Sequence, residues 1–162
     1  MSDDDRKVNL EEAARRLQEQ MERDILAAYG PTVLDHWKNP RNLGLLENPD
    51  GYARLSGTCG DTMEMSVRVG RDIVVGCGFT TDGCGATIVC GSTATWLATN
   101  RTIIEALGAV TTRGILELLG GLPEGDVHCA ELAAETLRRA LADYLAHRNE
   151  PWKKNFPRVE DR

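Results

Sequence analysis

A cysteine between two glycines, Gly83-Cys84-Gly85, separates a part of the chain that favours strands from a part that favours helices. The alternating residues before it end near Thr81, and the small residues of 86–97 predict a helix after it. Glycine on both sides permits a tight turn and a close approach of the backbone. We therefore expect Cys84 at a helix N-terminus, where unpaired N–H groups and the helix dipole favour a thiolate.

The strand-forming part has the pattern of an antiparallel hairpin. Apolar residues alternate with polar ones up to a turn at Gly70-Arg71-Asp72, and the alternation continues after it. The residues expected to face the core are Met63, Met65, Val67, Val69, Ile73, Val75, Cys77 and Phe79. A short strand is also expected over 52–55. With the helices that follow, the chain is expected to be α+β, with a small antiparallel sheet covered on one face.

Helical patterns flank this sheet and define the organisation of the chain. Residues 1–30 form an N-terminal amphipathic extension, in which a helix over 9–29 carries a stripe that includes Leu10, Leu17, Met21 and Ile25. The main domain spans 31–150, with helices expected over 32–38, 86–99, 102–107, 112–119 and 129–147. Residues 151–162 are interpreted as a C-terminal tail.

Charge and composition exclude several classes of function. The 19 Lys and Arg residues against 25 Asp and Glu give a net charge of −6, and no basic block is present, which argues against nucleic acid. No apolar run approaches the roughly 20 residues that a membrane span needs. Five cysteines without a signal peptide indicate a reducing compartment, so we expect a cytoplasmic protein with free or metal-bound thiols.

Two further elements carry residues that could join Cys84. Cys59-Gly60-Asp61 comes just before a strand, and His128-Cys129 begins the last long helix. Because Cys129 follows a turn with Pro123 and Gly125, we expect it to be the most mobile and reachable of the three thiols. The three cysteines are far apart in sequence, and no CxxC pair occurs, so only a folded domain could assemble them. Residue types and spacing leave two interpretations open, a metal or sulfur site and three unrelated thiols.

The remaining cysteines and histidines have simpler interpretations. Cys77 is in phase with Phe79 and is expected in the core. Cys90 lies six residues after Cys84, about 600° around a helix, and is expected to pack away from it. His36 and His147 are interpreted as surface or capping residues.

At these residues the sequence resembles the U-type iron–sulfur cluster assembly scaffolds, the IscU family and the N-terminal domain of NifU. The resemblance extends from about Thr32 to Tyr144. It rests on the run VLDHWKNPRNLG at 33–44, on Cys59-Gly60-Asp61, on Gly83-Cys84-Gly85 and on His128-Cys129.

The resemblance implies a three-stranded antiparallel sheet packed with helices, with a site at one exposed end. It implies a scaffold rather than an enzyme: persulfide sulfur arrives from a cysteine desulfurase, iron arrives separately, and a [2Fe–2S] cluster passes to apo-proteins. An iron or electron donor is a further partner that the resemblance implies. The positions that would bind the metal or cluster are Cys59, Asp61, Cys84, His128 and Cys129. Cys129 would accept the persulfide. The same ligands also suit Fe²⁺ and Zn²⁺, so purified protein could carry zinc.

The chain departs from the family in the segment before His128. Residues 122–127 read LPEGDV, without the Leu-Pro-Pro-Val-Lys motif through which IscU proteins meet their dedicated chaperone, so that partner is not expected. The serine-rich run after the central cysteine is also absent. Two alternatives remain open, a SufU-like zinc-dependent sulfurtransferase and a zinc-stabilised interaction module. His128 and the short spacing before Cys129 favour the scaffold over the sulfurtransferase.

Overall fold

Three antiparallel strands form a sheet in the order β1-β2-β3. The computed structural model describes residues 3–150 and 152. Within them the strands are β1 (Gly51–Ser56), β2 (Thr62–Gly70) and β3 (Ile73–Thr81). Arg71 and Asp72 both have positive φ, at 53° and 61°, in the two-residue turn between β2 and β3. The predicted α+β class, the hairpin and the third strand are confirmed.

The hairpin contains an irregularity that the alternating pattern did not predict. Val67 pairs with Cys77, but Val69 pairs with Val74, so β3 has an extra residue between these two pairs. The bulge puts Val74 in the core and leaves Val75 51% exposed. The expectation that Ile73 and Val75 face inward is therefore wrong, because the bulge shifts the side-chain phase by one residue.

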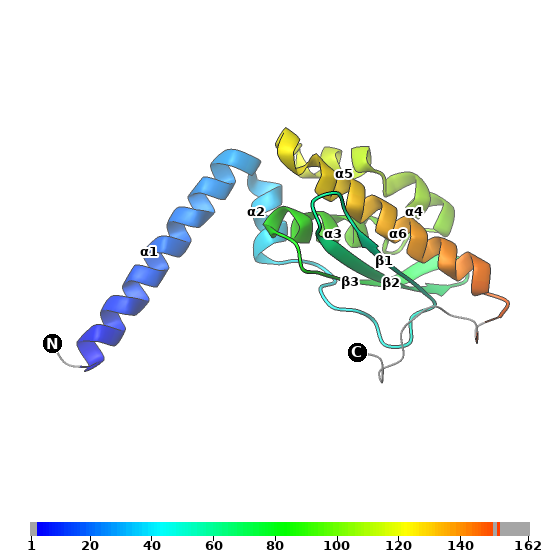
Figure 1. Ribbon diagram of the computed structural model, residues 1–162, viewed down its shortest axis with the longest axis horizontal. Coiled ribbons are helices and arrows are strands. Elements are labelled where there is room, and N and C mark those ends of the chain that lie inside the picture. Colours follow the sequence, from blue (N-terminus) through cyan, green and yellow to red (C-terminus); the bar gives the residue numbers. More distant parts are fainter. Residues whose placement is uncertain (1–2, 151, 153–162) are drawn as a thin grey trace.

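Six α-helices accompany the sheet in the described part of the chain. Their bounds are α1 (Asp3–Tyr29), α2 (Pro31–Lys38), α3 (Gly85–Ala98), α4 (Ile103–Ala109), α5 (Thr112–Leu119) and α6 (Val127–His147). A 3₁₀ turn, η1 (Glu124–Asp126), leads into α6. Figure 1 shows α3 and α6 lying along one face of the sheet, with α4 and α5 behind them, whereas the loop that leads to β1 runs below the opposite face.

The core lies between the sheet and these helices. Phe79, Met63 and Met65 contribute the largest fully buried side chains. Helix α3 comes so close to β3 that a Cβ atom on Gly91 would lie 2.5 Å from the Phe79 ring. A glycine is thus required where the small-residue helix crosses the central aromatic side chain.

Local capping explains where the shorter helices begin and end. The Thr102 side chain and Glu105 form a capping box at the start of α4, and the Thr111 hydroxyl accepts the Gly114 N–H at the start of α5. Gly120 ends α5 in the left-handed conformation, with φ 78°. Local hydrogen bonds and one left-handed glycine therefore set these helix ends.

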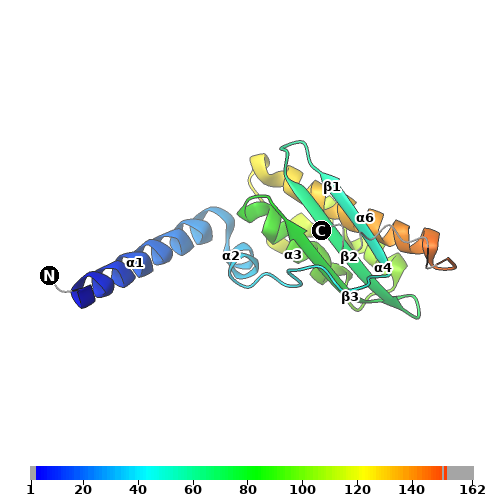
Figure 2. The same ribbon diagram turned by 60° about the horizontal axis from the view of Figure 1, so that its bottom comes forward.

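Helix α1 extends away from the rest of the molecule (Figures 1 and 2). It begins at Asp3 rather than near Asn9, and Leu10 of its apolar stripe is 71% exposed. Side-chain pairs four residues apart, such as Arg16 with Glu12, support its exposed turns. Among the described side chains of α1, those of Ile25 and Tyr29 in its last turns pack against the core cluster.

None of the helices in the described range 3–150 has the length and apolarity to cross a bilayer. The expected C-terminal tail falls almost entirely outside the described residues.

Candidate metal centre

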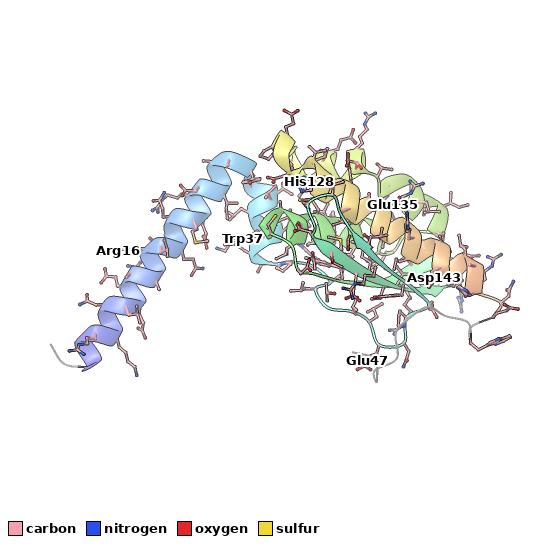
Figure 3. The ribbon with its side chains drawn as sticks, in the orientation of Figure 1. Arg16, Trp37, Glu47, His128, Glu135 and Asp143 are labelled. Atoms are coloured by element: carbon pink, nitrogen blue, oxygen red, sulfur yellow. The ribbon has the colours of Figure 1, made fainter. Side chains whose placement is uncertain are left out.

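The candidate ligands lie at one end of the sheet, where three connections meet. The β1–β2 loop carries Cys59 and Asp61, the β3–α3 turn carries Cys84, and the first turn of α6 carries His128 and Cys129. His128 lies at this end of α6 in Figure 3, and Asp143 lies at the opposite end of the helix.

Hydrogen bonds fix the two loops relative to each other. Within the β1–β2 loop, the Gly57 N–H donates to the Asp61 carbonyl at 2.8 Å, and Gly60 has φ +89°, which suits glycine. The Thr62 N–H donates to the Asp82 carboxylate at 2.6 Å, joining this loop to the β3–α3 turn. Asp61 and Cys84 are thereby held at the same edge.

Three of the candidate ligands converge. One ligand atom from each of Asp61, Cys84 and Cys129 lies within 4.8 Å of the other two. Two sulfurs and a carboxylate oxygen at this separation could bind one metal ion together. The set combines soft thiolates with one hard oxygen, and the structure thus brings together residues that are 68 positions apart in the sequence (129 − 61).

The other two candidate ligands, His128 and Cys59, are not members of this three-residue group. The His128 Nε2 atom is 3.5 Å from the Cys129 sulfur, so the imidazole borders the group. Cys59 is exposed in its loop and is not part of the three-residue group. It would have to move with the Thr58–Gly60 segment to contact the same metal.

Of the two converging thiols, that of Cys84 is exposed and has the lower pKa. Cys84 is the N-cap residue of α3, as predicted, and it is exposed. Partial burial raises the pKa of Cys84, but the nearby Thr87 N–H, the Thr87 hydroxyl and the Ala86 N–H outweigh it, so that its pKa is lowered. A low thiol pKa at a helix N-terminus favours both metal binding and nucleophilic sulfur chemistry.

Cys129 differs from the sequence-based expectation. Its side chain is buried, with 1% exposed, and burial raises its pKa to about 11, although the hydrogen bond with Thr87 acts in the opposite direction. The expectation that Cys129 is the most reachable thiol is wrong for this conformation, because α6 directs it toward α3 rather than toward solvent.

The remaining cysteines and histidines fall outside the group. Cys77 and Cys90 are buried in the hydrophobic core, as predicted. His36 is also buried and its Nδ1 lies 2.7 Å from the Ser92 hydroxyl, so its interpretation as a surface residue is wrong. His147 is partly exposed and contacts Asp143 at 3.0 Å, far from the site.

Sequence reasoning missed two polar residues at this end of the molecule. Thr87 is fully buried, and its hydroxyl donates to the Asp61 carboxylate at 2.8 Å. Asp126 accepts a 2.9 Å hydrogen bond from the Tyr29 hydroxyl and, with Cys84, lines a pocket of about 190 Å³ whose wall includes Trp37. The spacing of Thr87, three residues after Cys84 on one helix, was the available signal for the first.

Comparisons with solved structures agree with this fold. The N-terminal NifU-like protein of Brucella abortus superposes with a TM-score of 0.57 at 18% identity, over 75% of this chain and 97% of that one. A candidate iron–sulfur cluster assembly scaffold of the SUF system from Fervidobacterium islandicum superposes with a TM-score of 0.61 at 20% identity, over 72% and 98%. At these identities the likeness concerns the fold.

Sequence comparisons are more specific. The iron–sulfur cluster assembly scaffold protein IscU 1 of Archaeoglobus fulgidus is 43% identical over 118 residues, which cover 72% of this chain and 76% of the relative. The protein named IscU in Haemophilus influenzae is 36% identical over 124 residues, 74% of this chain and 97% of the relative. The family model for the NifU-like N-terminal domain matches residues 28–151. The chain therefore belongs to the family of NifU-like N-terminal domains.

Proposed function

We propose that this protein is a scaffold on which a [2Fe–2S] cluster is built from iron and persulfide sulfur and from which the cluster passes to apo-proteins. The observation that carries the proposal is the convergence of Asp61, Cys84 and Cys129 within 4.8 Å at an end of the molecule. Relatives at up to 43% identity are named as iron–sulfur cluster assembly scaffolds.

In this function the cluster is bound temporarily and then released, and the ligand set suits temporary binding. Cys84, Cys129, His128 and, after a loop movement, Cys59 would supply soft or intermediate ligands to iron. Asp61 supplies one hard oxygen, which binds such a cluster less firmly than a thiolate. A scaffold benefits from that weaker bond because an acceptor protein can displace it.

Cys129 is proposed as the residue that accepts sulfur. In the transfer, its thiolate attacks the outer sulfur of the desulfurase persulfide and the desulfurase thiolate leaves. Its burial and raised pKa mean that Cys129 must move out toward solvent before this step. The 3₁₀ turn Glu124–Asp126 and the glycines Gly120 and Gly121 precede it and provide a short connection that could make this movement.

The proposed partners follow from this chemistry. A cysteine desulfurase supplies sulfur, an iron or electron donor supplies Fe²⁺ or electrons, and apo-proteins with free ligands receive the cluster. The five free thiols suit a reducing compartment such as the cytoplasm.

Anaerobic reconstitution tests the proposal. The protein is incubated with Fe²⁺, cysteine, a cysteine desulfurase and a thiol reductant that supplies the electrons for converting persulfide sulfur to sulfide, and visible absorption and acid-labile sulfide are measured. The expected result is a sulfide-containing chromophore that a Cys84→Ser variant lacks and a Cys77→Ser variant retains. Absence of labile sulfide in the folded wild-type protein would contradict the proposal.

The alternative is a zinc-dependent sulfurtransferase, and the lowered pKa of the exposed Cys84 beside two potential zinc ligands favours it. The same mixture distinguishes the two functions if the protein is loaded with Zn²⁺ instead of Fe²⁺. A sulfurtransferase accelerates the desulfurase while it retains zinc and forms no chromophore. A scaffold gives its largest response with iron.

A further inference from the structure

The hydroxyl of Thr87 is oriented differently from the other threonine hydroxyls of α3. Thr93 donates to the Val89 carbonyl at 2.8 Å and Thr95 donates to the Gly91 carbonyl at 2.9 Å, each one turn earlier in the same helix. This bond to the preceding turn is the usual arrangement for a threonine inside a helix. Thr87 instead donates to Asp61, in the β1–β2 loop.

Thr87 contacts all three converging ligands with one oxygen atom. Its Oγ1 lies 2.8 Å from Asp61 Oδ2, 3.5 Å from the Cys129 sulfur and 3.6 Å from the Cys84 sulfur. A hydroxyl has one proton and two lone pairs. The carboxylate oxygen of Asp61 accepts this proton in the shortest of the three contacts, and the two sulfurs are its alternative acceptors.

The arrangement is tightly enclosed. Thr87 has no exposed surface. A Cβ atom on Gly83 would lie 2.5 Å from Asp61 Oδ2 and 2.7 Å from Thr87 Oγ1, so the glycine leaves only enough room for the hydrogen-bonded pair. A buried hydroxyl that keeps a fixed bond to a carboxylate restricts the rotation of that carboxylate. The oxygen of Asp61 is thereby held within reach of both sulfurs.

We propose that Thr87 is a positioning residue of the metal centre: its hydroxyl orients the Asp61 carboxylate toward Cys84 and Cys129 before a metal arrives. This inference rests on the proposed function for its biological role, although the contacts stand independently of it. All three neighbours can accept the single proton of Thr87, and the shortest contact, at 2.8 Å, is the one to Asp61. The bond to Asp61 then fixes which carboxylate oxygen remains directed at the metal.

Three substitutions separate positioning from packing. Thr87→Val keeps the shape and removes the hydroxyl, whereas Thr87→Ser keeps the hydroxyl and removes a methyl group. Thr93→Val is the matched control, because Thr93 is equally buried in α3 and its hydroxyl bonds only to its own helix. Thermal unfolding of each variant shows how much of any change belongs to the fold.

The measurement is anaerobic titration of the metal-free protein with Co²⁺ alone, followed by visible absorption. Thr87→Val is expected to bind Co²⁺ about 10-fold to 100-fold more weakly, the range found when a group that supports a metal ligand is removed. Its d–d bands should shift because the carboxylate is lost or reoriented, while the thiolate charge-transfer bands remain. Thr87→Ser should bind within about 3-fold of the wild type, and Thr93→Val should be unchanged.

Wild-type affinity and d–d bands in Thr87→Val would overturn the inference, as would an equal weakening in Thr93→Val. If the wild-type protein bound no Co²⁺, the inference would fall together with the metal centre. If Co²⁺ binding depended on Thr87 but reconstitution gave no labile sulfide, the inference would stand and the scaffold function would fail. Normal cluster assembly together with unaltered Co²⁺ binding in Thr87→Val would reject the positioning role of Thr87 and leave the scaffold function standing.

Discussion

The hydroxyl of Tyr29, the last residue of α1, donates a 2.9 Å hydrogen bond to the carboxylate of Asp126, three residues before Cys129. The bond to this carboxylate, followed by burial, raises the pKa of Tyr29, so the phenol stays protonated and remains the donor. The N-terminal extension is therefore joined to the segment that must move when Cys129 becomes accessible.

Tyr29→Phe removes this connection without changing the shape of the ring. We expect the free energy of unfolding to fall by about 1 kcal/mol, and amide hydrogen exchange in residues 120–129 to become faster. Tyr52→Phe is the control, because the Tyr52 hydroxyl also bonds to a carboxylate, that of Glu64 on β2. Unchanged exchange in the 120–129 segment of Tyr29→Phe would show that the bond does not restrain it.

Alkylation should distinguish the two thiols that converge at the site. In metal-free protein at about pH 8, iodoacetamide should modify Cys84 at least about 100-fold faster than Cys129, because Cys84 is exposed with a lowered pKa and Cys129 is buried with a pKa of about 11. Peptide mass spectrometry at several reaction times measures both rates in one sample. Similar rates would mean that Cys129 is largely outside the core in solution.

Sequence patterns predicted the elements of the site better than the directions of its side chains. Cys84 was placed correctly at the start of α3, because alternation, paired glycines and a small-residue helix all indicate the same boundary. The burial of Cys129 could also be predicted from the sequence. It precedes Ala133 by four residues and Leu137 by eight, so it lies on the apolar stripe of α6. The turn before Cys129 indicates exposure and the helical phase indicates burial, and the structure agrees with the phase.

Other features depend on contacts between distant parts of the chain and could not be predicted from local sequence. The bulge that exposes Val75 lies where β3 meets the segment 100–102, and there the Val74 N–H donates to the Arg101 carbonyl. Local alternation contains no information on that contact. The contact of Thr87 with Asp61 likewise joins two elements that the sequence separates by 26 residues. Cys59 lies in a glycine-containing turn, where no periodicity fixes the side-chain direction.

The buried thiol of Cys77 predicts a loss of stability at alkaline pH. Burial raises its pKa from 9.0 to about 12, although the Thr99 side chain acts in the opposite direction. Below about pH 9 the thiol is protonated in both states and has no effect; between pH 9 and 12 the unfolded chain ionises and the folded chain does not. In this window Cys77 should lower the free energy of unfolding by about 1.4 kcal/mol per pH unit.

Urea unfolding in reductant at about pH 8 and about pH 10.5 measures this effect. Cys77→Ala will be less stable at both values because it leaves a cavity, so the comparison concerns the change with pH. We expect a smaller change in the variant than in the wild type. An identical pH dependence would exclude Cys77 as the cause and leave Cys90 and Cys129.

Asp61→Ala is expected to make an assembled cluster longer-lived and to slow its delivery to an apo-protein. The carboxylate is the hardest of the proposed ligands and exchanges most readily, so it offers the entry point for an acceptor thiolate. Decay of the visible chromophore, with and without an apo-ferredoxin, measures both rates. A folded variant that binds no iron at all would instead make Asp61 essential for forming the centre.

The last prediction concerns which cysteine receives sulfur, and under which condition. In the structure Cys84 is exposed, whereas Cys129 is buried and in contact with Thr87. If iron is held by Asp61, Cys84, His128 and an inward-moving Cys59, Cys129 is released from the group and becomes the thiol that meets the desulfurase. Sulfur should therefore add to Cys129 when Fe²⁺ is bound and mainly to Cys84 when metal is absent.

Peptide mass spectrometry after desulfurase treatment would detect one added sulfur atom on the corresponding peptide. Cys129→Ser should still bind one metal ion but accept no sulfur in the iron-loaded state. Sulfur on Cys84 or Cys59 of the iron-loaded protein, with Cys129 unmodified, would reject this division of roles while leaving the scaffold function open.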